Sequence, residues 1–276
     1  MRPLAVLLLP VLLLSNGQAA LLFYEGFDYS MGEQLGEAAS TSSRWENDKD
    51  QFTVVAGSLD YARIQASTGN RLNVASTSLS LDSVRTALGA WASQSNGTLY
   101  ASFLLRVESM KGIGTNDAGT SVLTIGKTSN NSELLGINLL NDGGVKLGVL
   151  KYPSSSSQVS SAFLASGPGA NLSVDGSATY LVVAKYEWVA GATNDVVTLW
   201  VNPGDLGASE DPASQVSTSA GTDGSQTAGR LTLSRGPHLN IDEIRIGQSW
   251  AEVTPAVNRT AAAWARDPGT QSHQAN

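Results

Sequence analysis

Two neighbouring carboxylates, Asp242 and Glu243, are the first residues in this chain that could do chemistry, because they lie in an otherwise apolar, β-branched run. Such acids can take part in acid/base catalysis, bind a cation, or form the polar side of a strand. Successive side chains of a strand point to opposite faces, so these two carboxylates cannot converge on one bond. The pair therefore predicts no catalytic site by itself.

Aromatic and amide side chains could bind sugars, because pyranose rings stack on aromatic rings and amides hydrogen-bond hydroxyl groups. Two predicted strands, 179–188 and 196–202, carry the candidates Tyr186, Trp188, Trp200 and Asn202. If the strands pair as a hairpin with their apolar faces matched, these side chains form a platform on one sheet surface. The alternative is that the rings fill the core between two sheets or lie under a long loop.

Several other kinds of chemistry are excluded by residue type. The chain has no cysteine and only two histidines, His238 and His273, so a thiolate site or a three-histidine zinc site cannot form. It also has no phosphate-binding glycine motif, and its net charge is −7. An acidic surface argues against nucleic acid as a partner, since phosphates require clustered Lys and Arg.

The elements that must position the candidate residues are strands. Short runs rich in Val, Leu, Ile, Thr and Tyr alternate with Gly, Ser, Asn and Asp clusters, and helical periodicity is nearly absent. The run 98–107 places Leu99, Ala101, Phe103, Leu105 and Val107 on one face. Further strands are predicted at 21–27, 52–55, 58–63, 121–126, 134–139, 145–150, 179–188, 196–202, 230–234 and 241–246. So many strands favour two packed antiparallel sheets, with hairpin turns at 141–144 and 189–195 and long surface loops at 153–169 and 203–229.

Three segments follow from composition. Residues 1–19 have a positive Arg2, an apolar run and small residues before Leu21, which predict a signal peptide. The apolar run is too short to span a bilayer, so we expect no membrane span in the mature chain. Residues 20–255 then form one domain, and residues 256–276 a polar tail. We expect a bacterial protein that is secreted, periplasmic or attached to the cell surface.

The two ends of the mature chain resemble those of a known family. The start, with Phe23-Tyr24-Glu25-Gly26-Phe27-Asp28-Tyr29, and the finish, with Ile241-Asp242-Glu243-Ile244-Arg245-Ile246-Gly247, are similar to the first and last strands of bacterial concanavalin A-like lectin/glucanase domains, laminin-G-like relatives included. The resemblance implies an all-β, two-sheet antiparallel sandwich of the concanavalin A-like jelly-roll type. It leaves function open, because this fold carries lectins, glycanases, lyases and adhesion modules.

The resemblance also implies a cation site. Calcium-binding relatives contribute an acid from the first strand and an Asp from the last, at the places of Glu25 and Asp242. Calcium takes six to eight oxygen ligands, so carbonyls and water would complete a structural Ca²⁺ site that joins the two strands. The alternative is an Asp242 hydrogen-bonded to backbone, with Glu243 paired to Arg245 on the surface.

Catalytic carboxylates would follow a motif in relatives of this fold that cleave β-glucans, which place them on one strand as Glu-x-Asp-x-Glu. The nearest match is Glu46-Asn47-Asp48-Lys49-Asp50, but it lies in a polar stretch after Trp45, which we interpret as a solvated loop. The sequence therefore favours a non-catalytic module that binds a polysaccharide or surface glycan. The alternatives are a glycanase or lyase whose acids come from separate strands, and a structural or adhesive exoprotein with no small ligand.

Overall fold

The computed structural model of the protein describes residues 21–36, 44–46, 51–64, 68–75, 83–88, 96–127, 133–154, 159–213, 215–234 and 236–256. The predicted signal peptide, 1–19, lies outside these residues, as does the predicted tail 256–276 apart from Ala256. Within the described ranges, no helix is both long enough and apolar enough to cross a membrane.

The strands form two antiparallel sheets, which we call sheet A and sheet B. Sheet A has the order β13-β12-β11-β6-β15-β4-β3, and β1 pairs with β15 outside this path. Its strands are β1 (Phe23–Glu25), β3 (Phe52–Ala56), β4 (Asn70–Val74), β6 (Gly97–Ser109), β11 (Tyr180–Trp188), β12 (Val196–Val201), β13 (Gln215–Thr218) and β15 (His238–Gly247).

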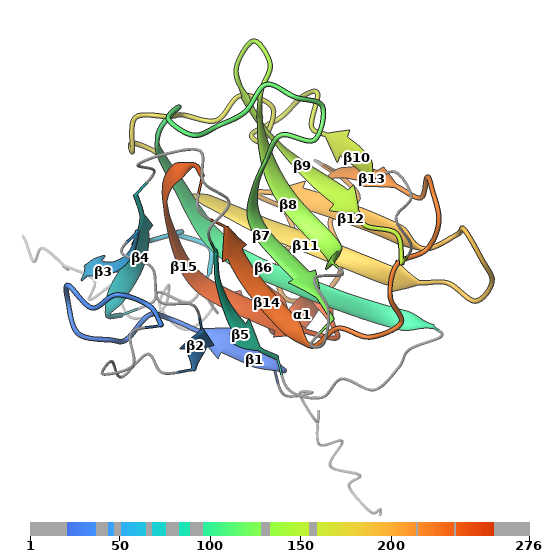
Figure 1. Ribbon diagram of the computed structural model, residues 1–276, viewed down its shortest axis with the longest axis horizontal. Coiled ribbons are helices and arrows are strands. Elements are labelled where there is room, and N and C mark those ends of the chain that lie inside the picture. The colour runs from blue at the N-terminus through green and yellow to red at the C-terminus, as the bar shows by residue number, and fades with distance from the viewer. Residues whose placement is uncertain are drawn as a thin grey trace, which may run out of the picture.

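Sheet B has the order β10-β9-β8-β7-β14-β5-β2. Its strands are β2 (Trp45–Glu46), β5 (Ser83–Ala87), β7 (Thr120–Gly126), β8 (Glu133–Asn141), β9 (Val145–Lys151), β10 (Ser160–Phe163) and β14 (Arg230–Ser234). In Figure 1, β7, β8 and β9 of this sheet pass in front of β6 and β11 of sheet A. The predicted fold class, an all-β antiparallel two-sheet sandwich of jelly-roll type, is confirmed.

The last strand, β15, is an interior strand of sheet A that pairs with three others. One of its edges pairs with β6. Its other edge pairs with β4 at Leu239–Ile241 and with β1 at Ile244–Ile246, so the first and last strands of the described chain lie side by side. This pairing agrees with the ends implied by the family resemblance.

Two hydrophobic clusters stabilise the sandwich. The main core lies between the sheets and includes the predicted inner face of β6, namely Leu99, Ala101, Phe103, Leu105 and Val107. A second cluster lies on the outer face of sheet A, where Leu104, Val183 and Trp200 pack against Leu59 and Trp250. The cluster buries its apolar surface under loops and under α1 (Trp250–Val253), so both faces of sheet A are apolar near its middle.

Every predicted strand except 58–63 corresponds to a strand of the structure, although the bounds differ by a few residues. Residues 58–63, predicted as a strand, form a loop in which Leu59 packs into the second cluster instead of pairing. The predicted long loops at 153–169 and 203–229 contain the edge strands β10 and β13. These strands are four residues each and mostly polar, so they carry little alternation signal.

Candidate functional site

The two predicted cation ligands, Glu25 and Asp242, lie on opposite faces of sheet A. Glu25 pairs with Ile244 on the inner face, where its carboxylate accepts a hydrogen bond from Trp45 Nε1 at 3.1 Å. Asp242 pairs with Leu104, which belongs to the outer cluster. The two carboxylates therefore do not share one ion. Among the described residues no group of three or more His, Cys, Asp or Glu could hold a metal, and a calcium ion with other ligands stays a prediction.

A β-bulge explains what Asp242 and Glu243 do instead. The register shifts between Asp242 and Arg245, and Glu243 has a φ of 55°, in the left-handed region. The Asp242 carboxylate accepts the N–H groups of Leu59 and Glu243, both at 2.8 Å. Glu243 accepts the Tyr24 hydroxyl at 2.8 Å and forms an ion pair with Arg245. This matches the alternative expected from the sequence, except that Glu243 is buried.

The environment of Asp242 is unusual for a carboxylate. Burial raises the pKa of Asp242 to about 7, and the charge of Glu243 also raises it, although the two backbone N–H groups act in the opposite direction. A buried carboxylate held by backbone groups fixes the loop at Leu59 to the sheet. Its role is structural.

The predicted aromatic platform is wrong, because the β11–β12 register separates its members. Tyr186 pairs with Val197 and Trp200 with Val183, so the two rings lie on opposite faces. Tyr186 and Trp188 belong to the core between the sheets, and Trp200 is buried in the second cluster, where its ring centroid lies 5.1 Å from that of Trp250. These are the two placements that the sequence left open as alternatives.

The fourth predicted sugar ligand, Asn202, directly follows β12. Its backbone has a φ of 52°, and its side-chain Oδ1 accepts the Leu181 N–H at 2.8 Å. Asn is one of the few side chains that tolerate this backbone region, so the contact stabilises the strand end.

The acidic run after Trp45 is described only in part. Glu46 lies in β2 with its carboxylate 3.8 Å from Arg85 Nε, and Asp48 lies outside the described residues.

A polar surface appears where the sequence predicts none, on the outer face of sheet B. In β14, Leu231 and Leu233 point into the core, so Arg230 and Thr232 point away from it. Thr232 pairs with Thr124 of β7, which in turn pairs with Gly136 of β8. We call the following set the sheet-B polar face: Thr124, Glu133, Asn138, Tyr152, Arg230 and Thr232.

Buried polar atoms without partners mark this face. In the part of the chain that the structure describes, Glu133 Oε2, Asn138 Oδ1, Arg230 Nε and Thr232 Oγ1 are buried and have no hydrogen-bond partner. They are four of the nine such atoms in the described residues, and the other five lie in loops, in β15 and in α1. A buried polar atom left unpaired costs about 1–3 kcal/mol. Such atoms are completed by ordered water, an ion or a ligand, and the presence of four on one sheet face makes this face the candidate site.

Two glycines bring aromatic rings onto the same face. A Cβ on Gly136 would lie 2.8 Å from Tyr152 Cε2, 3.2 Å from the Tyr152 hydroxyl and 3.4 Å from Asn138 Oδ1. A Cβ on Gly148 would overlap the Phe163 ring. The absence of side chains at these positions therefore lets both rings lie directly against the sheet, and it brings the Tyr152 hydroxyl close to an unpaired amide oxygen.

The charges of this face are loosely paired. Arg230 Nη2 lies 3.6 Å from Glu133 Oε1, which is beyond hydrogen-bonding distance. Burial, followed by the charge of Glu133, raises the pKa of Tyr152 to about 12. The phenol therefore stays protonated at neutral pH and can donate a hydrogen bond.

A second polar cluster lies on the outer face of sheet A and differs in its bonding. We call it the sheet-A network: Arg71, Asn73, Arg106, Glu108 and Asn240. Asn240 Oδ1 accepts bonds from Arg71 Nε at 3.2 Å and Asn73 Nδ2 at 3.3 Å, and its amide nitrogen donates to Glu108. Arg106 Nε donates to Glu108 Oε1 at 2.7 Å. The buried centre of this cluster is therefore fully bonded within the protein.

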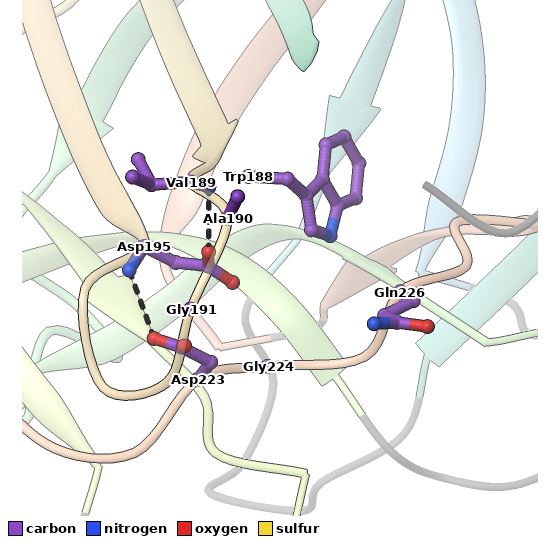
Figure 2. A pocket seen from close by; sticks show the side chains of 8 residues that line it. All are labelled: Trp188, Val189, Ala190, Gly191, Asp195, Asp223, Gly224 and Gln226. Carbon is purple, nitrogen blue, oxygen red and sulfur yellow. Dashed lines mark hydrogen bonds between the residues drawn. The ribbon is translucent and has the colours of Figure 1, made fainter. Parts of the chain in front are cut away.

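A small pocket lies at the end of the β11–β12 hairpin, with a cavity volume of about 190 Å³. Figure 2 shows Asp195 and Asp223 on one side of it and Trp188 and Gln226 on the other. The backbone of the hairpin loop and of Gly224 completes the wall. Trp188, predicted as a platform residue, thus lines a pocket, while its indole N–H is bonded to the Ser225 carbonyl at 2.9 Å.

Sequence reasoning missed the sheet-B polar face because its residues are contributed by separate strands and form no local motif. The alternation Arg230-Leu231-Thr232-Leu233 was visible as a strand, and only the strand order places Thr124 and Asn138 beside it. Glycines inside the predicted strands at Gly136 and Gly148 were the one local signal, because a strand glycine often marks a close approach.

Comparison with known proteins gives no family. No protein-family model matches the chain, and no curated protein sequence does either. Among solved structures, an endo-β-1,4-glucuronan lyase from Trichoderma reesei is 9% identical, with 86% of this chain and 99% of that chain covered and a TM-score of 0.48.

The globular domain of T. cruzi calreticulin is 10% identical, with 85% and 90% covered and a TM-score of 0.47. An endo-1,3-β-glucanase from Streptomyces sioyaensis is 11% identical, with 82% and 95% covered and a TM-score of 0.41. Likenesses at this level identify neither a family nor an activity, so the residues of the site must indicate the function.

Proposed function

We propose that this protein is an exported module that binds a polysaccharide or surface glycan on the sheet-B polar face. The observation that carries the proposal is the group of four buried, unpaired polar atoms on that face. Two of them are acceptors only, one is a donor only, and the Thr232 hydroxyl can do either. A ligand rich in hydroxyl groups fits this mixture, because each hydroxyl both donates and accepts.

Simple ions fit the site less well. An anion would bond to Arg230 Nε and leave the acceptors Asn138 Oδ1 and Glu133 Oε2 unpaired, whereas a cation would do the opposite. The rings of Tyr152 and Phe163 beside these atoms add apolar surface on which a sugar ring can stack. Export is supported by the predicted signal peptide, which lies outside the described residues.

The test is retention on a panel of insoluble polysaccharides and a glycan array, with and without Ca²⁺. The mature protein is compared with Asn138→Ala and with the control Asn73→Ala, which removes an amide from the sheet-A network. We expect Asn138→Ala to lower retention about tenfold, because a charged or multiply bonded contact is worth that much. Equal retention by both variants would contradict the polar face as the binding site. No retention by any of them on any glycan would favour a structural or adhesive protein.

A polysaccharide-degrading enzyme is the second candidate, and one observation favours it. Tyr152 lies on the same face as the Arg230–Glu133 pair, and a protonated phenol can act as a general acid. Two-carboxylate hydrolysis is less well supported, since the polar face as defined contains one carboxylate, Glu133. Release of soluble sugar from a retained polysaccharide, abolished in Tyr152→Phe while retention persists, would establish this activity.

A further inference from the structure

A buried ion-pair network lies behind the pocket at the β11–β12 hairpin. The Lys151 ammonium is fully buried and donates to Asp223 Oδ1 at 3.0 Å and to the Asp195 carbonyl at 2.8 Å. The Asp195 N–H also donates to Asp223 Oδ1, at 2.8 Å. Lysine is almost never fully buried without such partners. The network therefore fixes the Asp223 carboxylate and the Asp195 backbone at the pocket wall.

The charges of this network do not balance. Lys151 neutralises Asp223, with which it is directly paired. The Asp195 carboxylate is bonded to neutral donors, the Tyr186 hydroxyl at 2.7 Å and the Val189 N–H at 2.9 Å. Asp195 is only 4% exposed, and the residues that line the pocket include no Lys or Arg. One buried negative charge therefore remains beside the cavity, and such a charge is costly unless it is paired.

The opposite wall carries Trp188 and Gln226. Trp188 is only 3% exposed and its indole N–H is bonded to Ser225, so it adds apolar surface to the wall. Gln226 adds an exposed, uncharged polar side chain, so no positive charge of the protein competes for Asp195 on this wall. The cavity of about 190 Å³ is smaller than the pockets that hold drug-sized ligands, so it fits one small ring or head group.

We propose that this pocket binds a small protonated amine, such as the ammonium group of an amino sugar, with the ammonium paired to Asp195 beside Trp188. The site is separate from the sheet-B polar face, and its ligand is defined by charge instead of by hydroxyl groups. The proposal therefore does not depend on the proposed function.

The probe is glucosamine, and glucose is its neutral analogue. Binding is measured by isothermal titration and by NMR shift perturbation at about pH 6, where the amine is protonated. We expect glucosamine to bind about tenfold more tightly than glucose, since a charge-assisted hydrogen bond is roughly twice as strong as a neutral one. Equal affinities, or binding of neither sugar, would overturn the proposal.

A filled pocket gives the matched test in the same protein. Gln226→Trp places a large side chain at an exposed residue of the pocket. Ala192→Trp places the same side chain in the hairpin loop, at an exposed residue that is not part of the pocket lining. We expect the first variant to lose glucosamine binding and the second to keep it. Loss in both, or in neither, would contradict the location.

The charge itself is tested with Asp195→Asn, which keeps the size of the side chain. The preference for glucosamine over glucose should disappear in this variant, and a preserved preference would count against Asp195. Because the Asp195 carboxylate is bonded to Tyr186 and Val189, thermal melting first checks that Asp195→Asn folds. If Asp195→Asn does not fold, the Gln226→Trp variant tests the proposal in its place. Asn73→Ala, in the sheet-A network, should leave glucosamine binding unchanged, because this residue belongs neither to the pocket nor to the sheet-B polar face.

Discussion

The outer faces of the two sheets both carry buried polar side chains, and the difference lies in their partners. Asn240 in the sheet-A network is 2% exposed, and its amide is bonded to Arg71, Asn73 and Glu108. Asn138 on the sheet-B polar face is 3% exposed, and its Oδ1 has no partner among the described residues. Residue type and burial are therefore the same, and only the hydrogen bonding separates a structural cluster from a candidate binding site.

The largest expected effect is the pH dependence that Asp242 gives to the outer side of sheet A. Folding raises the pKa of Asp242 to about 7, so its contribution to stability is fully present below the unfolded pKa near 4 and is lost as the pH rises to about 8. Because a tenfold change in an acid dissociation constant corresponds to about 1.4 kcal/mol, the loss is at most roughly 4 kcal/mol.

Urea unfolding of the wild type and of Asp242→Asn between about pH 4 and pH 8 measures this effect. We expect the variant to show a flatter pH dependence. Parallel curves would mean that the pKa of Asp242 is the same in the folded and unfolded states, so that the hydrogen bonds from Leu59 and Glu243 and the charge of Arg71 fully offset its burial.

Asn240→Ala should produce the next largest effect, a fall in the free energy of unfolding of about 3 kcal/mol, because the part-buried side chains of Arg71, Asn73 and Glu108 lose their partner together. Denaturant unfolding measures the fall, and glycan retention should be unchanged. If this variant lost retention while keeping its stability, the assignment of the two faces would have to be exchanged.

Gly136→Ala tests the position of the Tyr152 ring on the sheet-B polar face. The added Cβ would meet Tyr152 at 2.8 Å, so the ring must move away from the sheet. We expect retention on the polysaccharide to fall about tenfold, with a loss of stability of about 1 kcal/mol, since overpacking costs roughly that much. Unchanged retention would exclude the Tyr152 ring from the binding surface.

The smallest effects come from a pair of matched threonines. Thr232→Val removes an unpaired hydroxyl, so stability should stay equal or rise by about 0.5 kcal/mol, while retention falls about threefold. Thr53→Val on sheet A removes a hydroxyl that donates to Gln34 at 3.0 Å, so stability should fall by about 1 kcal/mol with no change in retention. Melting curves and retention, measured on both variants, check the four outcomes. Equal behaviour of the two valines would remove the distinction between the faces.

The sequence predicted the sandwich because long strands such as β6 and β11 bury one alternating set of apolar residues. It failed on the aromatic residues because sheet A is apolar on both faces, so matching apolar faces could not decide on which side Trp200 lies. It placed the alternative contacts of Asp242 correctly, since a buried carboxylate needs donors wherever it lies. It could not find the sheet-B polar face, which exists only once β7, β8 and β14 are neighbours.

The pairing of β1 with β15 has a consequence for when the protein can fold. Residues near position 24 find their partners more than two hundred positions later, at Arg245 and its neighbours. A ribosome must release nearly the whole chain before sheet A can be completed, and such distant pairings form slowly.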